Sequence, residues 1–242
     1  IKTDDRDAEV LARASVRNED LPSVHLRSET SRSRREQVAS RATLLRSRKA
    51  LALSVKSWLR GRLVRLSGRA QSTAFCDAVR ATALEHSDGL PMAIDLLLQT
   101  FEHLTEQIEK LDEEISQIAQ NDPLCVRLMT VPGVGPIVAL SFATHIDEIA
   151  RFESSEQLAS YLALVPGEAT TGGKTVRTGT IKAGPSYLKA LLVEAAWSMW
   201  RCRPNDPAVL WARSIADKRG KRIAIVALAR KLATVLYAIL KH

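Results

Sequence analysis

Cysteine is scarce in this sequence, and the few cysteines are not spaced like metal ligands. The three, Cys76, Cys125 and Cys202, lie far apart, and no two of them form a CxxC pair. The five histidines are equally scattered. These absences argue against a disulfide framework and against a built-in metal cage, and they indicate free or buried thiols in a reducing cytoplasm.

Long hydrophobic runs and a secretory leader are also missing. No uncharged apolar stretch approaches the roughly 20 residues that a membrane helix needs, so we expect no membrane role. The sequence starts at Ile1, and we interpret that end as the cut edge of a longer protein. The remaining composition, with 45% apolar residues among 242, is typical of a globular protein with a buried core.

Acidic residues are outnumbered, and the excess of positive charge is concentrated in one stretch. The formal net charge is +8, which places nucleic acid first among the expected partners. The stretch between Ser31 and Ala70 contains twelve basic residues and a single acid, Glu36. Apolar residues from Leu44 to Leu63 recur there near helical spacing, which predicts a long helix with an arginine-rich, phosphate-facing surface. A solvated helix face is the alternative.

A second long helix is predicted from Ile94 to Ile118. Its apolar residues alternate by threes and fours, with Glu and Gln between them, and such a heptad seam needs a partner helix. The partner is either the arginine-rich helix, in an antiparallel hairpin, or another subunit. After Asn121 we expect short helices at Ile137–His145, Ser155–Leu164, Tyr187–Trp200, Pro207–Lys218 and Arg222–Leu240.

The first motif that points to chemistry is the turn VPGVGP, which contains Gly133 and Gly135. The glycines let the backbone turn sharply, and Pro136 then starts a helix whose free N–H groups point back at the turn. Backbone donors and the helix dipole bind phosphate oxygens, as in a helix-hairpin-helix element. A tight structural turn between two helices is the alternative.

The second motif, from Val165 to Gly184, combines glycines, hydroxyls and cations. Thr170 and Thr171 supply hydroxyls that can attack or bind phosphorus, and the cations offset charge on a phosphoryl transition state. These cations are Lys174, Arg177 and Lys182. The glycine spacing differs from that of the NTPase phosphate loop. Without a family, a flexible surface loop is the competing interpretation.

The third motif is the acidic start of the sequence. Asp4 and Asp7 are three residues apart, so on a helix they share a face and can hold Mg²⁺ together with other carboxylates. The alternative is an ordinary helix start, because Thr3 is a good N-cap and acids are favoured in a first turn.

Together these segments resemble the transposases of the insertion-sequence 110 family, also called the 110/116/902 family. The resemblance covers nearly the whole chain and is most specific between Leu162 and Trp197. The segments that carry it, in order, are KTDDRDAEVLA, DLPSVHLRSE, VPGVGPIVA, FESSEQLASYLALVPGE, TGGKTVRTGTIKAGPSYLKALLVEAAW and KRGKRIAIVALARKLATVLYAIL.

The resemblance implies a mainly α fold in three parts. Residues 1–25 would be a remnant of an N-terminal resolvase-like, RNase-H-type nuclease domain. Residues 26–122 would form a long helical hairpin or coiled-coil spacer. Residues 123–242 would form a small helical C-terminal transposase domain that contains the helix-hairpin-helix element.

The resemblance also implies a mechanism and partners. Family members hold Mg²⁺ with four carboxylates and use a serine nucleophile. Asp4 and Asp7 match the last two carboxylates, and Thr171, with Thr170 beside it, occupies the serine position. The implied partners are DNA, a structured guide RNA and further copies of the chain in a dimer or tetramer. The implied location is the bacterial cytoplasm, in association with the nucleoid.

Two departures from the family pattern lead us to expect impaired catalysis. The first aspartate and the glutamate of the family site would lie upstream of Ile1, and the β-methyl of Thr171 crowds an in-line attack. One hypothesis is a transposase that cleaves and rejoins DNA strands by phosphoryl transfer, with Lys174, Arg177 and Lys182 stabilising phosphate charge. The alternative is a catalytically inactive fragment that binds nucleic acid and oligomerises. A third hypothesis is a structural coiled-coil protein.

Overall fold

The computed structural model describes residues 4–16, 24–66, 72–86, 89–171, 174–181 and 183–241. These residues form ten α-helices, one short 3-10 helix and one β-hairpin, so the predicted mainly α fold is confirmed. The helices are α1 (Asp4–Val16), α2 (Glu29–Gly61), α3 (Ala74–His86), α4 (Met92–Asn121), α5 (Pro123–Met129), α6 (Pro136–Ile146), η1 (Ile149–Arg151), α7 (Ser155–Tyr161), α8 (Ser186–Cys202), α9 (Pro207–Arg219) and α10 (Lys221–Lys241). The strands are β1 (Pro166–Thr171) and β2 (Lys174–Thr180).

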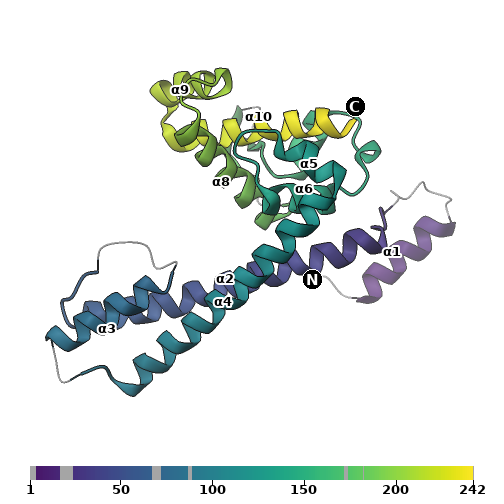
Figure 1. Cartoon of the computed structure of the whole chain (residues 1–242). Coiled ribbons are helices and arrows are strands. Elements are labelled where there is room, and N and C mark those ends of the chain that lie inside the picture. Colours follow the sequence, from purple (N-terminus) through teal and green to yellow (C-terminus); the bar gives the residue numbers. More distant parts are fainter. Residues whose placement is uncertain are drawn as a thin grey trace.

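The two long helices α2 and α4 lie side by side and form a spacer (Figure 1). Two hydrogen bonds between side chains show the relative direction of the helices. Gln37 donates to Glu114 at 2.7 Å, and Arg48, further along α2, donates to Thr105 at 3.4 Å. As the residue number rises in α2 its partner's number falls in α4, so the helices are antiparallel. The sequence left two possible partners for the heptad seam of α4, and in the structure the partner is the arginine-rich helix α2.

The distal part of the spacer has a small core of its own. Val55 and Leu59 from α2 pack there with Leu98 and Phe101 from α4 and with Phe75 from α3. The rings of Phe75 and Phe101 lie 5.5 Å apart in a tilted arrangement, which is a favourable geometry for two aromatic side chains. Apolar packing thus holds α2, α3 and α4 together at the distal end of the spacer.

At the other end, the spacer shares a core with the C-terminal helices. Every residue from Val138 to Ile146 in α6 is buried, and α6 packs against α2, α4, α5 and α8. Val38, Ile115 and Ala119 of the spacer belong to the same apolar cluster. By length and composition α10 could cross a membrane, but all of its buried residues except Ala224 belong to this cluster. It packs against α7, α8 and α9, as a core helix does.

A carboxylate at the end of α6 fastens the start of α2. The side chain of Asp147 accepts hydrogen bonds from the backbone N–H of Ser28 at 3.0 Å, from Nε2 of His25 at 2.9 Å, and from the hydroxyls of Ser28 and Ser31. Burial raises the pKa of Asp147, but these hydrogen bonds outweigh burial and hold the pKa well below its usual value. The charged carboxylate therefore stabilises the junction between the spacer and the C-terminal helices.

The glycine-rich and threonine-rich segment is an antiparallel β-hairpin, where the sequence suggested a loop. Pro166 pairs with Thr180 at its base, and Thr171 pairs with Lys174 at its tip, with an irregularity between Pro166 and Glu168. Threonine and valine favour extended backbone, because their branched Cβ atoms are accommodated well in a strand. The clustered hydroxyls that indicated a loop thus belong to paired strands.

Candidate nucleic-acid interface

A cationic groove of about 650 Å³ lies where the base of the hairpin meets α10. Pro166, Gly179 and Thr180 line it on the hairpin side. The helical side contributes three arginines, which are Arg219, Arg222 and Arg230. Its apolar lining comes from Leu164, Ile223, Val226 and Ala227. The groove therefore combines guanidinium groups with small and apolar surfaces.

Two of the three groove arginines are available for an external anion. Arg219 and Arg222 are exposed, and neither side chain has a hydrogen bond or ion pair with a residue in the described part of the chain. Arg230 is half-buried. The pKa of Glu156 is lowered first by the hydrogen bonds of Glu156 itself, and the charge of Arg230 makes a smaller contribution in the same direction. Guanidinium groups present planar donors that match phosphate oxygens, so this groove can hold a sugar–phosphate backbone.

The base of the hairpin is held in place by α8. Lys189 donates hydrogen bonds to Oγ1 of Thr180 at 2.6 Å and to the carbonyl of Ile181 at 3.2 Å. Burial lowers the pKa of Lys189. Gly184, with φ of +119°, turns the chain from β2 into α8 so closely that an added Cβ would lie 2.6 Å from the carbonyl oxygen of Tyr161. One wall of the groove is therefore anchored to the core.

The predicted nucleophiles lie in the same hairpin as the groove. Thr170 and Thr171 end β1. Thr171 lies five positions after Pro166, which lines the groove, and this corresponds to about 17 Å along a strand. Lys174 and Arg177 lie in β2, across from Thr171 and Glu168. The side chains of residues 168–171 and 174–178 lie outside the described parts of the structure, as does the whole of Lys182. The backbone thus places the hydroxyl and two cation positions on paired strands.

Two glycines in the turn between α5 and α6 were predicted to bind phosphate, and packing explains why one of them is a glycine. Gly133 has φ of +88°, and a Cβ added there would lie 2.5 Å from the carbonyl oxygen of Ala195 in α8. Gly135 is the N-cap of α6, and a Cβ added there would meet nothing within 4 Å. Gly133 is therefore required by the approach of α8, and phosphate binding by this turn stays a prediction.

Aromatic side chains alternate with cations on the surface next to the groove. Lys221 lies over the rings of Trp197 and Trp200, at 5.1 and 5.4 Å from their centroids, and Lys231 lies 4.7 Å from that of Trp211. A second hollow, of about 410 Å³, is lined by Trp211 and Lys231 and shares Arg230 with the groove. Basic surfaces that contain aromatic rings are typical of nucleic-acid binding.

The groove arginines were missed at the level of the sequence. Arg219 and Arg222 belong to the run KRGKR, whose four cations flank the glycine between α9 and α10. That run was a usable signal, because clustered Lys and Arg indicate a nucleic-acid surface. Arg230 gave no such signal, since only the fold brings it to the groove.

Asp4 and Asp7 both lie in α1, three residues apart, and a shared metal-binding face stays a prediction. Asp7 is exposed, and the side chain of Asp4 lies outside the described residues. Within the described ranges no group of three or more His, Cys, Asp or Glu side chains is arranged to hold a metal ion. Two carboxylates provide only part of the octahedral oxygen shell that Mg²⁺ requires.

Comparison with known proteins places these features in a family context. Residues 125–210 match the transposase family IS116/IS110/IS902. A probable family 20 transposase of Pseudomonas aeruginosa is 32% identical over 250 residues, which include all of this chain and 72% of the relative. The transposase for the insertion sequence element IS1111A of Coxiella burnetii is 35% identical over 137 residues, or 56% of this chain and 38% of the relative.

A third relative has a comparable similarity. The transposase for the insertion sequence element IS1328 of Yersinia enterocolitica is 30% identical over 164 residues, which are 66% of this chain and 49% of the relative. The chain thus spans 72% of the Pseudomonas protein and less than half of the other two.

Proposed function

The chain belongs to the IS116/IS110/IS902 family of transposases, and on that premise we propose that it acts in DNA transposition by binding DNA in the groove beside the hairpin. The observation that supports this function is the set of exposed arginines, Arg219 and Arg222, next to the strand that ends in Thr170 and Thr171. A phosphate backbone held by these arginines would run along the hairpin toward both hydroxyls.

The proposed chemistry is a phosphoryl transfer that conserves the number of ester bonds. The hydroxyl oxygen of Thr171 attacks a DNA phosphorus in line, and a P–O bond to that oxygen forms as the bond to one deoxyribose oxygen breaks. The departing deoxyribose oxygen gains the proton that the threonine hydroxyl gives up. Rejoining is the reverse reaction with a second DNA end, whose hydroxyl displaces the threonine. Lys174, Arg177 and Lys182 would stabilise the charge on the transition state.

In this proposal Asp4 and Asp7 are the only residues assigned to bind Mg²⁺. These residues would contribute two carboxylates, and the described residues do not complete a site around them. The steps above therefore do not depend on the metal. Further parts of the proposal come from the family alone: a structured guide RNA, assembly into a dimer or tetramer, and a location in the bacterial cytoplasm with the nucleoid.

A second candidate function is nucleic-acid binding and oligomerisation without catalysis. The observation that favours it is the threonine at the nucleophile position. Its β-methyl restricts χ1 and crowds the in-line approach to phosphorus. In that case the groove would still hold DNA, but no covalent link between protein and DNA would form.

A cleavage and trapping experiment separates the two functions. The chain and its variants Thr171→Ser, Thr171→Ala and Thr170→Ala are incubated with labelled DNA, with and without Mg²⁺, and adducts stable to detergent are counted. We expect more adduct with Thr171→Ser and none with Thr171→Ala, at equal DNA affinity. If the chain and every variant bind DNA but form no adduct, the first function is wrong and the second, binding without catalysis, is supported. No DNA binding at all would overturn both.

A further inference from the structure

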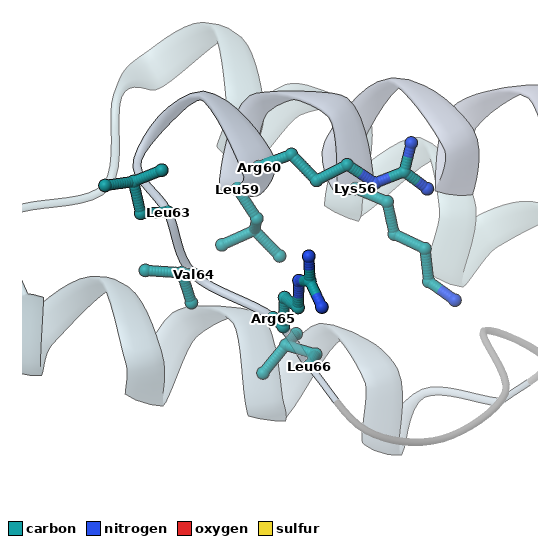
Figure 2. A pocket seen from close by; sticks show the side chains of 7 residues that line it. All are labelled: Lys56, Leu59, Arg60, Leu63, Val64, Arg65 and Leu66. Atoms are coloured by element: carbon teal, nitrogen blue, oxygen red, sulfur yellow. The ribbon is translucent and has the colours of Figure 1, made fainter.

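The distal end of the spacer carries a second basic pocket, of about 540 Å³ (Figure 2). This end lies far from the C-terminal helices (Figure 1). Its lining residues are Lys56, Leu59, Arg60, Leu63, Val64, Arg65 and Leu66. In Figure 2 the nitrogen atoms of Lys56, Arg60 and Arg65 gather toward one side, while Leu63 and Val64 lie toward the other. We refer to this set of residues as the spacer tip.

The arginines of α2 have different surroundings at its two ends. Near the C-terminal helices, Arg34 forms an ion pair with Asp122, and Arg41 forms one with Asp112. At the spacer tip, by contrast, the side chains of Arg60 and Arg65 have no ion pair or hydrogen bond with any residue in the described ranges. The tip end of α2 therefore carries arginines without a counter-ion in the described ranges, unlike Arg34 and Arg41 at the other end.

Acidic residues are present near the tip, but another arginine binds them. Arg80 of α3 forms ion pairs with Glu102 at 2.6 Å, with Asp95 at 3.6 Å and with Asp77 at 3.9 Å. These three acids form their ion pairs with Arg80 and not with the cations of the spacer tip. Like charges that line one pocket repel one another, and a polyanion would relieve that repulsion.

Aromatic rings hold two further cations at the same end of α2. The guanidinium of Arg62 lies 4.3 Å from the ring centroid of Trp58, and the ammonium of Lys56 lies 5.7 Å from that of Phe75. These contacts restrict the side chains without neutralising them, so their charge remains available for an anion. Leu63 is 94% exposed, whereas the other apolar side chains of the tip, Leu59, Val64 and Leu66, are buried or half-buried.

From these observations we infer that the spacer tip is a second binding site for the phosphate backbone of duplex DNA. The inference takes the partner, DNA, from the function proposed above, and adds a contact outside the groove. From Arg34 to Arg60 the helix rises about 39 Å, at 1.5 Å per residue. That length corresponds to roughly one turn of duplex DNA. A duplex must therefore extend about one turn beyond the C-terminal helices to reach the tip.

The test compares duplex lengths by fluorescence anisotropy. The chain and the double variant Arg60→Ala/Arg65→Ala bind labelled duplexes of about 8 and about 36 base pairs, which at about 3.4 Å per pair are shorter and longer than the rise of about 39 Å from Arg34 to Arg60. We expect the double variant to bind the long duplex about tenfold more weakly and the short duplex unchanged. Its salt dependence on the long duplex should fall by about 1.8, since each lost phosphate contact contributes about 0.9 to the slope.

Two matched variants make the result decisive. Arg46→Ala/Lys49→Ala removes the same charge from exposed positions in the middle of α2, and an equal loss there would show that net charge, not the tip, sets the affinity. Arg222→Ala/Arg230→Ala removes groove cations and should weaken binding to both lengths. If only the groove variant weakens binding, the tip inference is wrong and the proposed function stands. If tip substitutions instead abolish self-association in sedimentation and leave DNA affinity intact, a second copy of the chain occupies the tip and the inference is also overturned.

Discussion

Two glycines in the turn before α6 have the same side chain but different structural requirements. Gly133 has a positive φ and lies against the backbone of α8, whereas Gly135 has φ of −97° and open space around its Cα. Both were predicted to bind phosphate because their sequence spacing is the same as in a backbone-binding turn. The difference between them depends on α8, which lies more than fifty residues away in the sequence, so the sequence motif alone did not distinguish them.

Replacing Gly133 by alanine should strongly destabilise the fold. The new Cβ would approach the carbonyl oxygen of Ala195, and the backbone would be strained at positive φ, at a combined cost of about 2–4 kcal/mol. Gly135→Ala is the matched control and should cost less than about 1 kcal/mol as an N-cap change. Urea unfolding followed by circular dichroism measures both. Equal losses would contradict the assigned packing role of Gly133.

Asp147 makes the stability of the spacer junction depend on pH. Its pKa in the folded protein lies below that of an unfolded chain, so its contribution is fully present above the unfolded value of about 3.9 and is lost as the pH falls through the folded value. We expect Asp147→Asn to be less stable near neutral pH and to lose less further stability than the unmodified chain on acidification below about pH 4.

The control for this prediction is Asp217→Asn. Asp217 is exposed, and within the described ranges its side chain has no hydrogen bond or ion pair. Thermal unfolding between about pH 3 and pH 7 should therefore give the same profile for the control and for the unmodified chain. An Asp147→Asn profile parallel to these two would show that the hydrogen bonds from Ser28, Ser31 and His25 do not depend on the charge.

At the scale of elements, α2 uses its arginines in two ways. Arg41, with a side chain 12% exposed, pairs with Asp112 of α4 and donates to the hydroxyl of Tyr187 in α8 at 3.0 Å. Arg46 is exposed, and among the described residues its side chain donates hydrogen bonds only within its own helix, to Ala42 and Thr43. Arg41 thus joins three helices, whereas Arg46 leaves its charge to solvent or to a partner.

Removing the charge of Arg41 should separate these two uses. Arg41→Met keeps an apolar stem but loses the hydrogen bonds to Asp112 and Tyr187, which should cost about 1.5–3 kcal/mol. Arg46→Met should change stability by less than about 0.5 kcal/mol. Chemical unfolding of the two variants checks the difference. Equivalent stabilities would mean that the cross-helix network contributes nothing measurable.

The helices were the part of the fold that the sequence predicted best. Apolar spacing and terminal signals, such as Pro207 after the capping Asp206, placed α6 to α10 within a few residues of their observed bounds. The β-hairpin was not predicted, because threonine and glycine obscure the alternation that identifies a strand. The groove was not predicted either, since Arg230 lines the same groove as Thr180 only after α10 packs on the core.

The whole molecule combines a long spacer with a compact group of C-terminal helices, and uncompensated cations lie at both ends. The groove beside the hairpin lies in the C-terminal part, and the spacer tip lies at the opposite end (Figure 1). Between them, ion pairs such as Arg34–Asp122 use the spacer arginines to hold the two parts together. Assembly of the fold therefore determines which of the many arginines remain free to bind DNA.

The central claim is that the groove beside the hairpin holds a DNA backbone, and the salt dependence of binding tests it most directly. The unmodified chain, Arg222→Gln/Arg230→Gln and the charge-matched Arg32→Gln/Arg46→Gln are titrated with one labelled duplex at several salt concentrations. The groove variant should bind more weakly, with a slope of log affinity against log salt reduced by about 1.8, whereas the control keeps the slope of the unmodified chain. A groove variant whose slope and affinity equal those of the unmodified chain would contradict the account.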